Sequence, residues 1–310
     1  MISILIATYQ RPTQLKQCLL SIAETGYKNC EVLIIDQSED DKTKKLVDLL
    51  GNPHVLYIHE KIKNKSVALN KGMKQAKGDI FAFTDDDCIV SKDWLTTIQK
   101  DFTSKQNISG VFGSTFPYKP ASHKGLYCVS THEHKQSAVI SKPCKHSECI
   151  GYGNNMAWRR SACKTHRFST WLGPNSIGQN AEDADFTLRQ LIHGNIIFCD
   201  KKLVVCHNHW VNKQLHAKQN TIYIHGEMAC YGNFALQGWG FAKKVILQNF
   251  ISSVQDIKRC CGDLVKRKQA NSHQWNTSFH FFWARITGFA IGCLYFLKKI
   301  KKDQSIYSVK

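Results

Sequence analysis

Three short, almost continuously apolar runs constrain the fold of this 310-residue chain more than any other feature. They span Ile2–Ala7, Glu31–Ile35 and Ile80–Thr84, and each is too short to be read first as a helix. Such runs are typical of strands that are buried on both faces, as in a parallel sheet covered by helices. The chain is therefore expected to alternate strands with helices.

Helical spacing fills the segments between these runs. We expect helices at Leu15–Ile22, Thr43–Leu50 and Val67–Ala76, and a short strand at Val55–Ile58. Ser66 is the predicted N-cap of the third helix. This order implies a mostly parallel sheet with right-handed crossovers, in which ligands bind beyond the carboxyl ends of the strands.

The second half of the chain begins with a long polar segment. Phe116–Ile150 is rich in His and Lys, which predicts a loop region that contacts substrate. Asn180–Gly194 then predicts a helix, and the short strands Ile196–Phe198 and Leu203–Cys206 follow it. After Trp210 the pattern is helical to the end.

Positive charge is concentrated in the C-terminal part. The chain carries 42 Lys and Arg against 24 Asp and Glu, and Lys243–Lys310 contribute +10 of the net +18. Such a balance favours anionic partners: nucleotides, nucleic acid or an acidic membrane surface. Because no RNA-recognition motif with interleaved aromatic residues is present, nucleic acid is not expected.

One strongly apolar segment lies in this basic region. Phe279–Leu297 is interrupted by His280 and Arg285, so it predicts a poor membrane span. An interfacial helix fits it better, because aromatic residues within it are followed by Lys298, Lys299, Lys301 and Lys302.

The chain contains 13 cysteines. The strand pattern begins at Ile2, so no signal peptide is expected and the thiols are predicted to be reduced and to fill apolar space. Cys144 and Cys149 could form a metal cluster with the nearby His132, His134 and His146. Their spacing is not that of a standard zinc module, which favours simple packing.

The triplet Asp85-Asp86-Asp87 directly follows the third apolar run. Adjacent carboxylates repel one another unless a cation neutralises them, and Mg²⁺ or Mn²⁺ often joins carboxylates to a substrate's phosphates. Alternate residues of an extended segment point the same way, so Asp85 and Asp87 are the candidate ligands and Asp86 is expected to point away. Taken alone, a solvated turn is the simpler interpretation.

Glu182 and Asp183 open a predicted helix whose expected N-cap is Asn180. One interpretation is that both carboxylates merely complement the helix dipole. The other is that one of them is a general base that deprotonates an acceptor hydroxyl, since a helix N-terminus fixes a carboxylate and favours its ionised form. The residues themselves leave both interpretations open.

Other polar residues follow predicted strands. Asp36 could accept a hydrogen bond from a nucleobase or a ribose, or could cap a turn. Thr8 and Arg11 could reach a nucleotide or could simply build the first turn. His207 and His209 could complete a Mn²⁺ shell begun by carboxylates, although surface histidines need no such role.

Six motifs occur in a fixed order over roughly residues 2–209. They are Ser3–Tyr9 with Arg11-Pro12; Glu31–Asp36; Ala68–Gly72; Gly78–Ile80 with Asp85–Asp87; Gly153–Ala157 with Arg159-Arg160; and Glu182–Asp185 with Leu188-Arg189. This order resembles family 2 glycosyltransferases. The resemblance implies a GT-A fold, a metal-dependent enzyme, and transfer of a sugar from a nucleotide-diphosphate donor to an acceptor hydroxyl with inversion.

The resemblance also implies roles for individual residues. It implies that Asp36 contacts the base, that Asp85 and Asp87 bind ribose and a divalent metal (Mn²⁺ or Mg²⁺), and that His207 joins the metal. Asp183 is implied as the general base, with Glu182 as the second candidate. The remaining predicted donor-binding residues are Thr8, Arg11 and Asn155.

The sequence departs from the family pattern in three places. Lys65 stands where the family often has glycine, Leu69 stands where it often has arginine, and Phe116–Ile150 shows no clear family pattern. The multi-span tail of processive synthases is also missing, which predicts one sugar per encounter.

The expected domains are a GT-A domain at 1–212 and a basic helical region at 213–310. Within the first, 1–113 is the nucleotide-binding half and 114–212 the acceptor half. We expect a cytoplasmic enzyme, peripheral on the inner face of the cytoplasmic membrane. It would build a surface glycan or glycolipid on a glycan or lipid-linked acceptor.

Two other functions compete with this expectation. A nucleotidyltransferase can share such a sheet and metal, but Thr8–Pro12 lacks the glycine-rich phosphate loop expected of one. A non-catalytic protein that binds RNA or membrane through its charge would not need the carboxylates at all.

Overall fold

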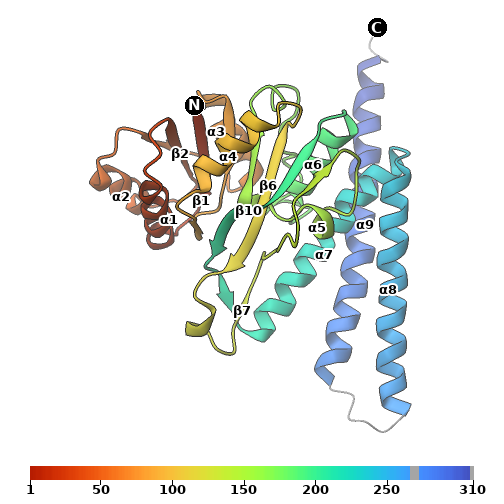
Figure 1. The fold of residues 1–310 in the computed structure, drawn as a ribbon. Coiled ribbons are helices and arrows are strands. Elements are labelled where there is room, and N and C mark those ends of the chain that lie inside the picture. The colour runs from red at the N-terminus through yellow and green to blue at the C-terminus, as the bar shows by residue number, and fades with distance from the viewer. Residues whose placement is uncertain (266–271, 308–310) are drawn as a thin grey trace. The chain divides into compact units, whose positions relative to one another are not determined.

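The computed structural model describes residues 1–265 and 272–307, with side chains described up to Lys258 and from Thr277 to Lys299. The side chains of Lys301 and Lys302, which the interfacial-helix prediction included, lie outside this set. Contacts divide the chain into two units (Figure 1). The first comprises Met1–Thr170 and Glu182–Asn212, and the second comprises Trp171–Ala181 and Lys213–Lys310.

The first unit is built on one nine-stranded sheet. Its order is β3-β2-β1-β4-β9-β6-β10-β5, and β8 also pairs with β10. The strands are β1 (Ile2–Thr8), β2 (Cys30–Asp36), β3 (Val55–His59), β4 (Ile80–Phe83), β5 (Cys88–Val90), β6 (Gly110–Pro117), β8 (Ala138–Ile140), β9 (Met156–Arg159) and β10 (Ile197–His207). The short strands β7 (Tyr127–Cys128) and β11 (Trp210–Val211) pair separately.

Parallel pairing joins β1, β2, β3 and β4, and also joins β6 to β10. The pairs that involve β5, β8 and β9 are antiparallel. The predicted sheet flanked by helices is confirmed, with these antiparallel strands inserted into it. The register pairs Thr8 with Asp36, so the first two strands end level with each other.

Helices cover both faces of the sheet because successive strand residues point to opposite sides. On one face Ile4 packs in a core with Leu19, and on the other Leu5 packs in a core with Leu69. The first face is covered by α1 (Pro12–Glu24), α2 (Lys42–Leu50) and α4 (Trp94–Ser104), and the second by α3 (Lys65–Gln75) and α6 (Glu182–Ile192).

Both predicted helix caps are wrong. Helix α3 begins at Lys65, and the side chain of Asn64 accepts the capping hydrogen bond from the Val67 N–H at 3.1 Å, so Ser66 lies inside the helix. Helix α6 begins at Glu182, so Asn180 is not its N-cap. Several neighbouring polar residues have a similar propensity for the N-cap position, and only the path of the folded chain decides which of them occupies it.

The predictions for residues 116–206 also need correction. The two expected strands after α6 are one strand, β10, with an irregularity between Asp200 and Val204. The expected loop Phe116–Ile150 contains β7, β8 and the short helix α5 (His146–Cys149). Strand β8 joins the main sheet although two of its three residues are exposed, so no buried apolar run marks it in the sequence.

The second unit is helical, as predicted. Its helices are α7 (Lys213–Leu236), α8 (Gly240–Val265) and α9 (Ser272–Tyr307), which run alongside one another (Figure 1). A Cβ on Gly288 would lie 2.2 Å from the His225 carbonyl oxygen, and a Cβ on Gly292 would lie 2.1 Å from that of Ala229. Helix α9 therefore packs backbone to backbone on α7 at these two glycines.

A buried carboxylate outside the strand-end region provides a test of the packing. Burial, together with the nearby Asp200, raises the pKa of Asp101 to about 6, although Lys105 opposes the shift from 3.1 Å. Because the pKa of Asp101 is higher in the folded chain than in the unfolded chain, its protonated carboxyl stabilises the fold. This stabilisation is fully present below the pKa of the unfolded chain and is lost as the pH rises through about 6. We expect Asp101→Asn to have a higher free energy of unfolding than the parent at pH 8. This gain should be on the order of 1–2 kcal/mol larger at pH 8 than at pH 4.5. Urea unfolding at both pH values measures this difference, and an equal effect at both would contradict it.

Candidate active site

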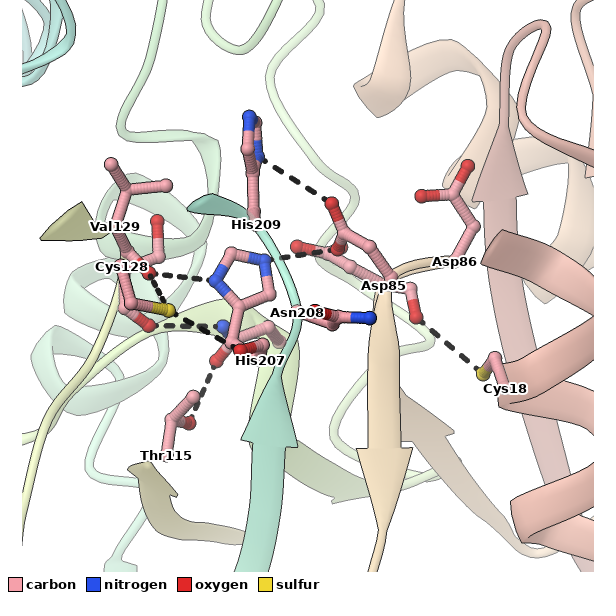
Figure 2. Close-up of polar contacts among 12 residues, drawn as sticks. Cys18, Asp85, Asp86, Thr115, Cys128, Val129, His207, Asn208 and His209 are labelled. Atoms are coloured by element: carbon pink, nitrogen blue, oxygen red, sulfur yellow. Dashed lines mark hydrogen bonds and ion pairs between the residues drawn. The ribbon is translucent and has the colours of Figure 1, made fainter. Parts of the chain in front are cut away.

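Polar side chains from separate strands meet beyond the carboxyl ends of these strands. Thr8 ends β1, Asp36 ends β2, the aspartate triplet follows β4, and His207 ends β10. Figure 2 shows Val129 and Cys128 on one side of the His207 ring and Asp85 and Asp86 on the other. The topology thus gathers residues from both halves of the chain at one place.

Asp87, His207 and His209 form a cluster of potential metal ligands. One ligand atom from each lies within 4.8 Å of the others, and no other such group occurs among the described residues. The Asp87 Oδ1 lies 2.9 Å from the His207 Nε2, and the Asp87 Oδ2 lies 3.5 Å from the His209 Nδ1. Asp87 and His207 are buried.

His207 is oriented by its second ring nitrogen. Its Nδ1 lies 2.6 Å from the Val129 carbonyl oxygen, which can only accept a proton, so this nitrogen donates. The Nε2 beside Asp87 must then carry either a second proton or a lone pair. Burial disfavours the imidazolium, but the hydrogen bonds with Asp87 and Cys128 and the charges of Asp87 and Asp85 together outweigh burial and raise the pKa of His207 to about 10.

This arrangement fits a divalent cation. A backbone carbonyl that fixes one imidazole nitrogen leaves the other free as a ligand, which is the usual outer contact of a metal-binding histidine. One carboxylate and two imidazoles suit Mn²⁺ and other first-row divalent metals. These three residues support a divalent metal at this site.

Asp85 lies outside that cluster. Its Oδ1 is 2.6 Å from the Lys65 Nζ, and its side chain is 26% exposed. Its metal role therefore has no support from the placement of its carboxylate, whereas a role in binding the donor remains a prediction.

Asp86 is buried and binds two predicted donor-site residues. The Thr8 hydroxyl donates to its Oδ2 at 2.7 Å, and the Arg11 Nη1 lies 3.3 Å from its Oδ1. The same Arg11 nitrogen lies 2.7 Å from the Asp87 Oδ2. Figure 2 shows Asp86 away from His207 and His209, and its contacts fix Thr8 and Arg11 beside the metal cluster.

The two buried carboxylates beside Arg11 have opposite pKa shifts, although the charge of Arg11 lowers the pKa of both. Burial and the charge of Asp87 raise the pKa of Asp86 to about 7. Burial also opposes ionisation of Asp87, but the hydrogen bond from His207 and the charges of His207 and Arg11 hold its pKa well below its usual range. Asp87 is therefore the carboxylate that stays ionised.

Asp36 is fully buried, and both of its oxygens accept hydrogen bonds. The Ser38 N–H donates to Oδ1 at 2.9 Å, and the Tyr57 hydroxyl donates to Oδ2 at 3.0 Å. Its turn-capping role is thus present in the structure, and its contact with a nucleobase stays a prediction.

The two carboxylates at the start of α6 have different surroundings. Asp183 accepts hydrogen bonds from the Gly153 N–H at 2.6 Å and from the Ala184 N–H at 2.8 Å. Glu182 is buried, with its Oε1 3.6 Å from the Lys65 Nζ. Burial raises the pKa of Glu182 to about 7, although Lys65 opposes the shift. Two backbone donors thus fix Asp183, as a general base requires.

The placement of Asn155 gives no support to its predicted role in donor binding. Its side chain is 0% exposed. It accepts a hydrogen bond from the Trp94 Nε1 at 2.9 Å and donates to the carbonyls of Ser114 and Leu203 at 2.8 and 3.0 Å. Its amide is satisfied inside the protein, so Asn155 joins three elements of the fold.

Three residues at this edge make contacts that their sequence positions did not predict. The family resemblance implied His207 but not His209 as a metal ligand, although residues two apart on an extended segment share a face. Asp86 was expected to point away, and Lys65 was only a departure from the family pattern. For the last two, the sequence offered no signal, because each acts through a partner that only the folded chain brings near.

The profile of glycosyl transferase family 2 matches residues 3–167, which is more than half of the chain. The chain belongs to glycosyl transferase family 2. The predicted family is therefore confirmed. The match includes the aspartate triplet and ends before α6.

The aligned part of this chain covers only part of its curated relatives. It is 31% identical over 132 residues to an uncharacterized glycosyltransferase of Rickettsia felis, covering 42% of this chain and 21% of that protein. It is 28% identical over 193 residues to the succinoglycan biosynthesis protein ExoM of Rhizobium meliloti, covering 60% of this chain and 59% of ExoM. The chain thus spans between a fifth and three fifths of the length of these relatives.

Solved structures share the fold at low sequence identity. The mannosyltransferase PcManGT from Pyrobaculum calidifontis, in complex with GDP-Man and Mn²⁺, has a TM-score of 0.61 and 15% identity over 95% of this chain and 87% of that one. The S. aureus TarS fragment 1–349 with UDP-GlcNAc has a TM-score of 0.60 and 14% identity over 97% of this chain and 92% of that one. The predicted GT-A fold class is confirmed.

Proposed function

We propose that this chain transfers a sugar from a nucleotide-diphosphate donor to an acceptor hydroxyl, with inversion at the anomeric carbon. The observation that carries the proposal is the Asp87–His207–His209 cluster beyond the strand ends, beside Thr8 and Arg11. Family membership supports the same reaction class. The Mn²⁺ and nucleotide sugars of the two structural neighbours are compatible with it.

The proposed reaction places Asp183 next to the acceptor. The acceptor oxygen forms a bond to the anomeric carbon, and its proton passes to Asp183. The bond from that carbon to the diphosphate oxygen breaks, and the nucleoside diphosphate leaves with the bonding electrons. Asp183 is suited to this role because two backbone N–H groups hold it in one orientation.

The proposed donor site includes the metal cluster and the residues beside it. Asp87, His207 and His209 would hold Mn²⁺ or Mg²⁺, and we favour Mn²⁺ because two of the three ligands are imidazoles. When bound, the metal stabilises charge on the leaving diphosphate. Arg11, whose side chain is 40% exposed, would add a second positive charge, and Asp36 would contact the base.

The domain roles are also proposals. We assign catalysis to the sheet-containing unit and attachment to the helical unit, which takes in Trp171–Ala181 besides the residues after 212. Helix segment Thr277–Lys299 is long and apolar enough to cross a membrane by length and composition, and 22% of its apolar 18-residue window is buried. The large apolar residues that are exposed on this segment and on α8 are Leu247, Ile251, Val254, Phe279, Trp283, Leu294 and Leu297.

We propose that this apolar surface lies in the plane of an anionic cytoplasmic membrane rather than across it. Helix α9 is packed on α7 through Gly288 and Gly292, and the buried Arg285 donates a hydrogen bond to the Ser253 hydroxyl of α8. A spanning α9 would have to leave these partners. An in-plane helix keeps them and exposes its apolar side to the lipid.

Flotation with phosphatidylglycerol-containing vesicles tests this attachment. We expect the full chain to float, high salt to weaken binding, and Trp283→Ser to weaken it about tenfold or more, since a buried aromatic side chain contributes roughly 2 kcal/mol. Leu49→Ser, which removes an exposed apolar residue from the first unit, is the control. Resistance of the bound protein to alkaline carbonate would show that it spans the bilayer and would contradict the in-plane arrangement.

A panel of nucleotide sugars tests the reaction itself. UDP-glucose, UDP-GlcNAc, GDP-mannose and dTDP-rhamnose are each incubated with the protein and Mn²⁺ or Mg²⁺, and nucleotide release is measured. We expect metal-dependent release that saturates with one donor and is faster with Mn²⁺. Release from none of them, with broader panels giving the same result, would contradict the proposed function.

A further inference from the structure

Lys65 is held in a fixed position at the start of α3. The preceding residue, Asn64, caps the helix through its Oδ1 and donates from its Nδ2 to the Thr170 carbonyl oxygen at 2.9 Å. Both contacts restrain the backbone that carries Lys65. The position from which the Lys65 side chain extends is therefore defined.

The ammonium group of Lys65 lies between two site carboxylates. Its Nζ is 2.6 Å from the Asp85 Oδ1, after β4, and 3.6 Å from the Glu182 Oε1, at the start of α6. The Lys65 side chain is 24% exposed. Asp85 accepts a hydrogen bond from Lys65, whereas the longer distance to Glu182 is an ion pair only. The ammonium therefore keeps donor capacity beyond its bond to Asp85.

Glu182 has an oxygen without a partner. Its Oε2 is buried and accepts no hydrogen bond from the described part of the chain. The neighbouring carboxylates differ, because both oxygens of Asp183 and both of Asp86 have partners. A buried carboxylate oxygen left unsatisfied is costly, so such an oxygen points to a ligand that completes it.

We propose that Lys65 and Glu182 together bind hydroxyl groups of the sugar that is transferred. Lys65 donates a hydrogen bond to one hydroxyl, and the Glu182 Oε2 accepts one from another, so a pair of neighbouring hydroxyls satisfies both. This inference rests on the proposed function, and it assigns the pair to substrate specificity rather than to proton transfer.

The charge of the pair selects the sugar over the other parts of the donor. The single positive charge of Lys65 already faces the carboxyl groups of Asp85 and Glu182, so the group offers no excess positive charge to a diphosphate. A sugar hydroxyl is neutral and is both donor and acceptor. The diphosphate instead finds positive charge at Arg11 and the metal cluster.

Paired binding measurements test the inference. The probes are UDP-glucose, UDP-GlcNAc and GDP-mannose, each compared with its free nucleoside diphosphate, in titrations with Mn²⁺. For the donor that binds the parent best, we expect Lys65→Met and Glu182→Gln each to weaken nucleotide-sugar binding about tenfold or more and nucleoside diphosphate binding less than about threefold. Lys71→Met is the matched control, because Lys71 lies on the same helix and pairs with Glu60 at 3.0 Å.

The outcomes separate this inference from the function on which it rests. Equal weakening of nucleotide sugar and nucleoside diphosphate, or no weakening of either, would overturn the inference alone. A parent protein that binds no nucleotide sugar would instead contradict the proposed function. If Lys65→Met fails to fold, Glu182→Gln gives the same comparison.

Discussion

Replacing Asp183 by asparagine is expected to lower kcat by a factor of about 10²–10⁴, the usual range for loss of a general base. Asparagine keeps the shape of the side chain but cannot take the proton of the acceptor hydroxyl. Donor binding should stay close to that of the parent, because Asp183 is assigned to the acceptor and not to the donor. Initial rates and donor titrations on the same preparation measure both quantities.

Asp79→Asn is the control for this substitution, because the Asp79 side chain is 85% exposed and pairs with the N-terminal amine. Asparagine can accept only one of the hydrogen bonds that reach Asp183 from Gly153 and Ala184, so a modest loss of thermal stability is also expected. A variant with kcat within about threefold of the parent would show that Asp183 is not the general base. Loss of donor binding without loss of kcat would place it in the donor site.

Replacing Asp87 by alanine is expected to abolish specific metal binding and to lower activity at least about a thousandfold. Asp87 is the only carboxylate in the ligand cluster of the described residues, and it also holds Arg11 at 2.7 Å. Electron paramagnetic resonance of Mn²⁺ added to the protein without donor reports binding independently of turnover. Asp87→Asn, which keeps a polar side chain of the same size, guards against a variant that merely fails to fold.

The two histidines should contribute unequally to metal binding. His207 is buried and fixed by the Val129 carbonyl, whereas the side chain of His209 is 34% exposed. We therefore expect His207→Ala to weaken Mn²⁺ binding more than His209→Ala does, with the exposed His59→Ala as the control. Unchanged Mn²⁺ binding in Asp87→Ala would mean that the metal is held elsewhere.

Much of the fold could be predicted because buried parallel strands leave a strong signal. Ile2–Ala7, Glu31–Ile35 and Ile80–Thr84 are apolar runs since helices cover both of their faces, and all three correspond to observed strands. The order of strands and helices then determined which ends meet. Thr8, Asp36 and the aspartate triplet could be placed at one edge of the sheet for that reason alone.

What the sequence could not predict depends on contacts between residues distant in the chain. Strands β5 and β8 have three residues each and pair with β10, so no local period distinguishes them from loop. Asn155 lies in a family motif, which suggested a site residue, yet three partners from other elements enclose it. Lys65 shows the opposite case: its importance comes from Asp85 and Glu182, which only the folded chain brings near.

The identity of the released phosphate compound tests the central claim most directly. Phosphorus-31 NMR of a reaction with the saturating nucleotide sugar, Mn²⁺ and protein distinguishes the possible products in one spectrum. We predict that nucleoside diphosphate accumulates with the parent and does not accumulate with Asp87→Ala. Accumulation of pyrophosphate or nucleoside monophosphate, or equal release by both proteins, would contradict the assignment of a metal-dependent glycosyltransferase site to these residues.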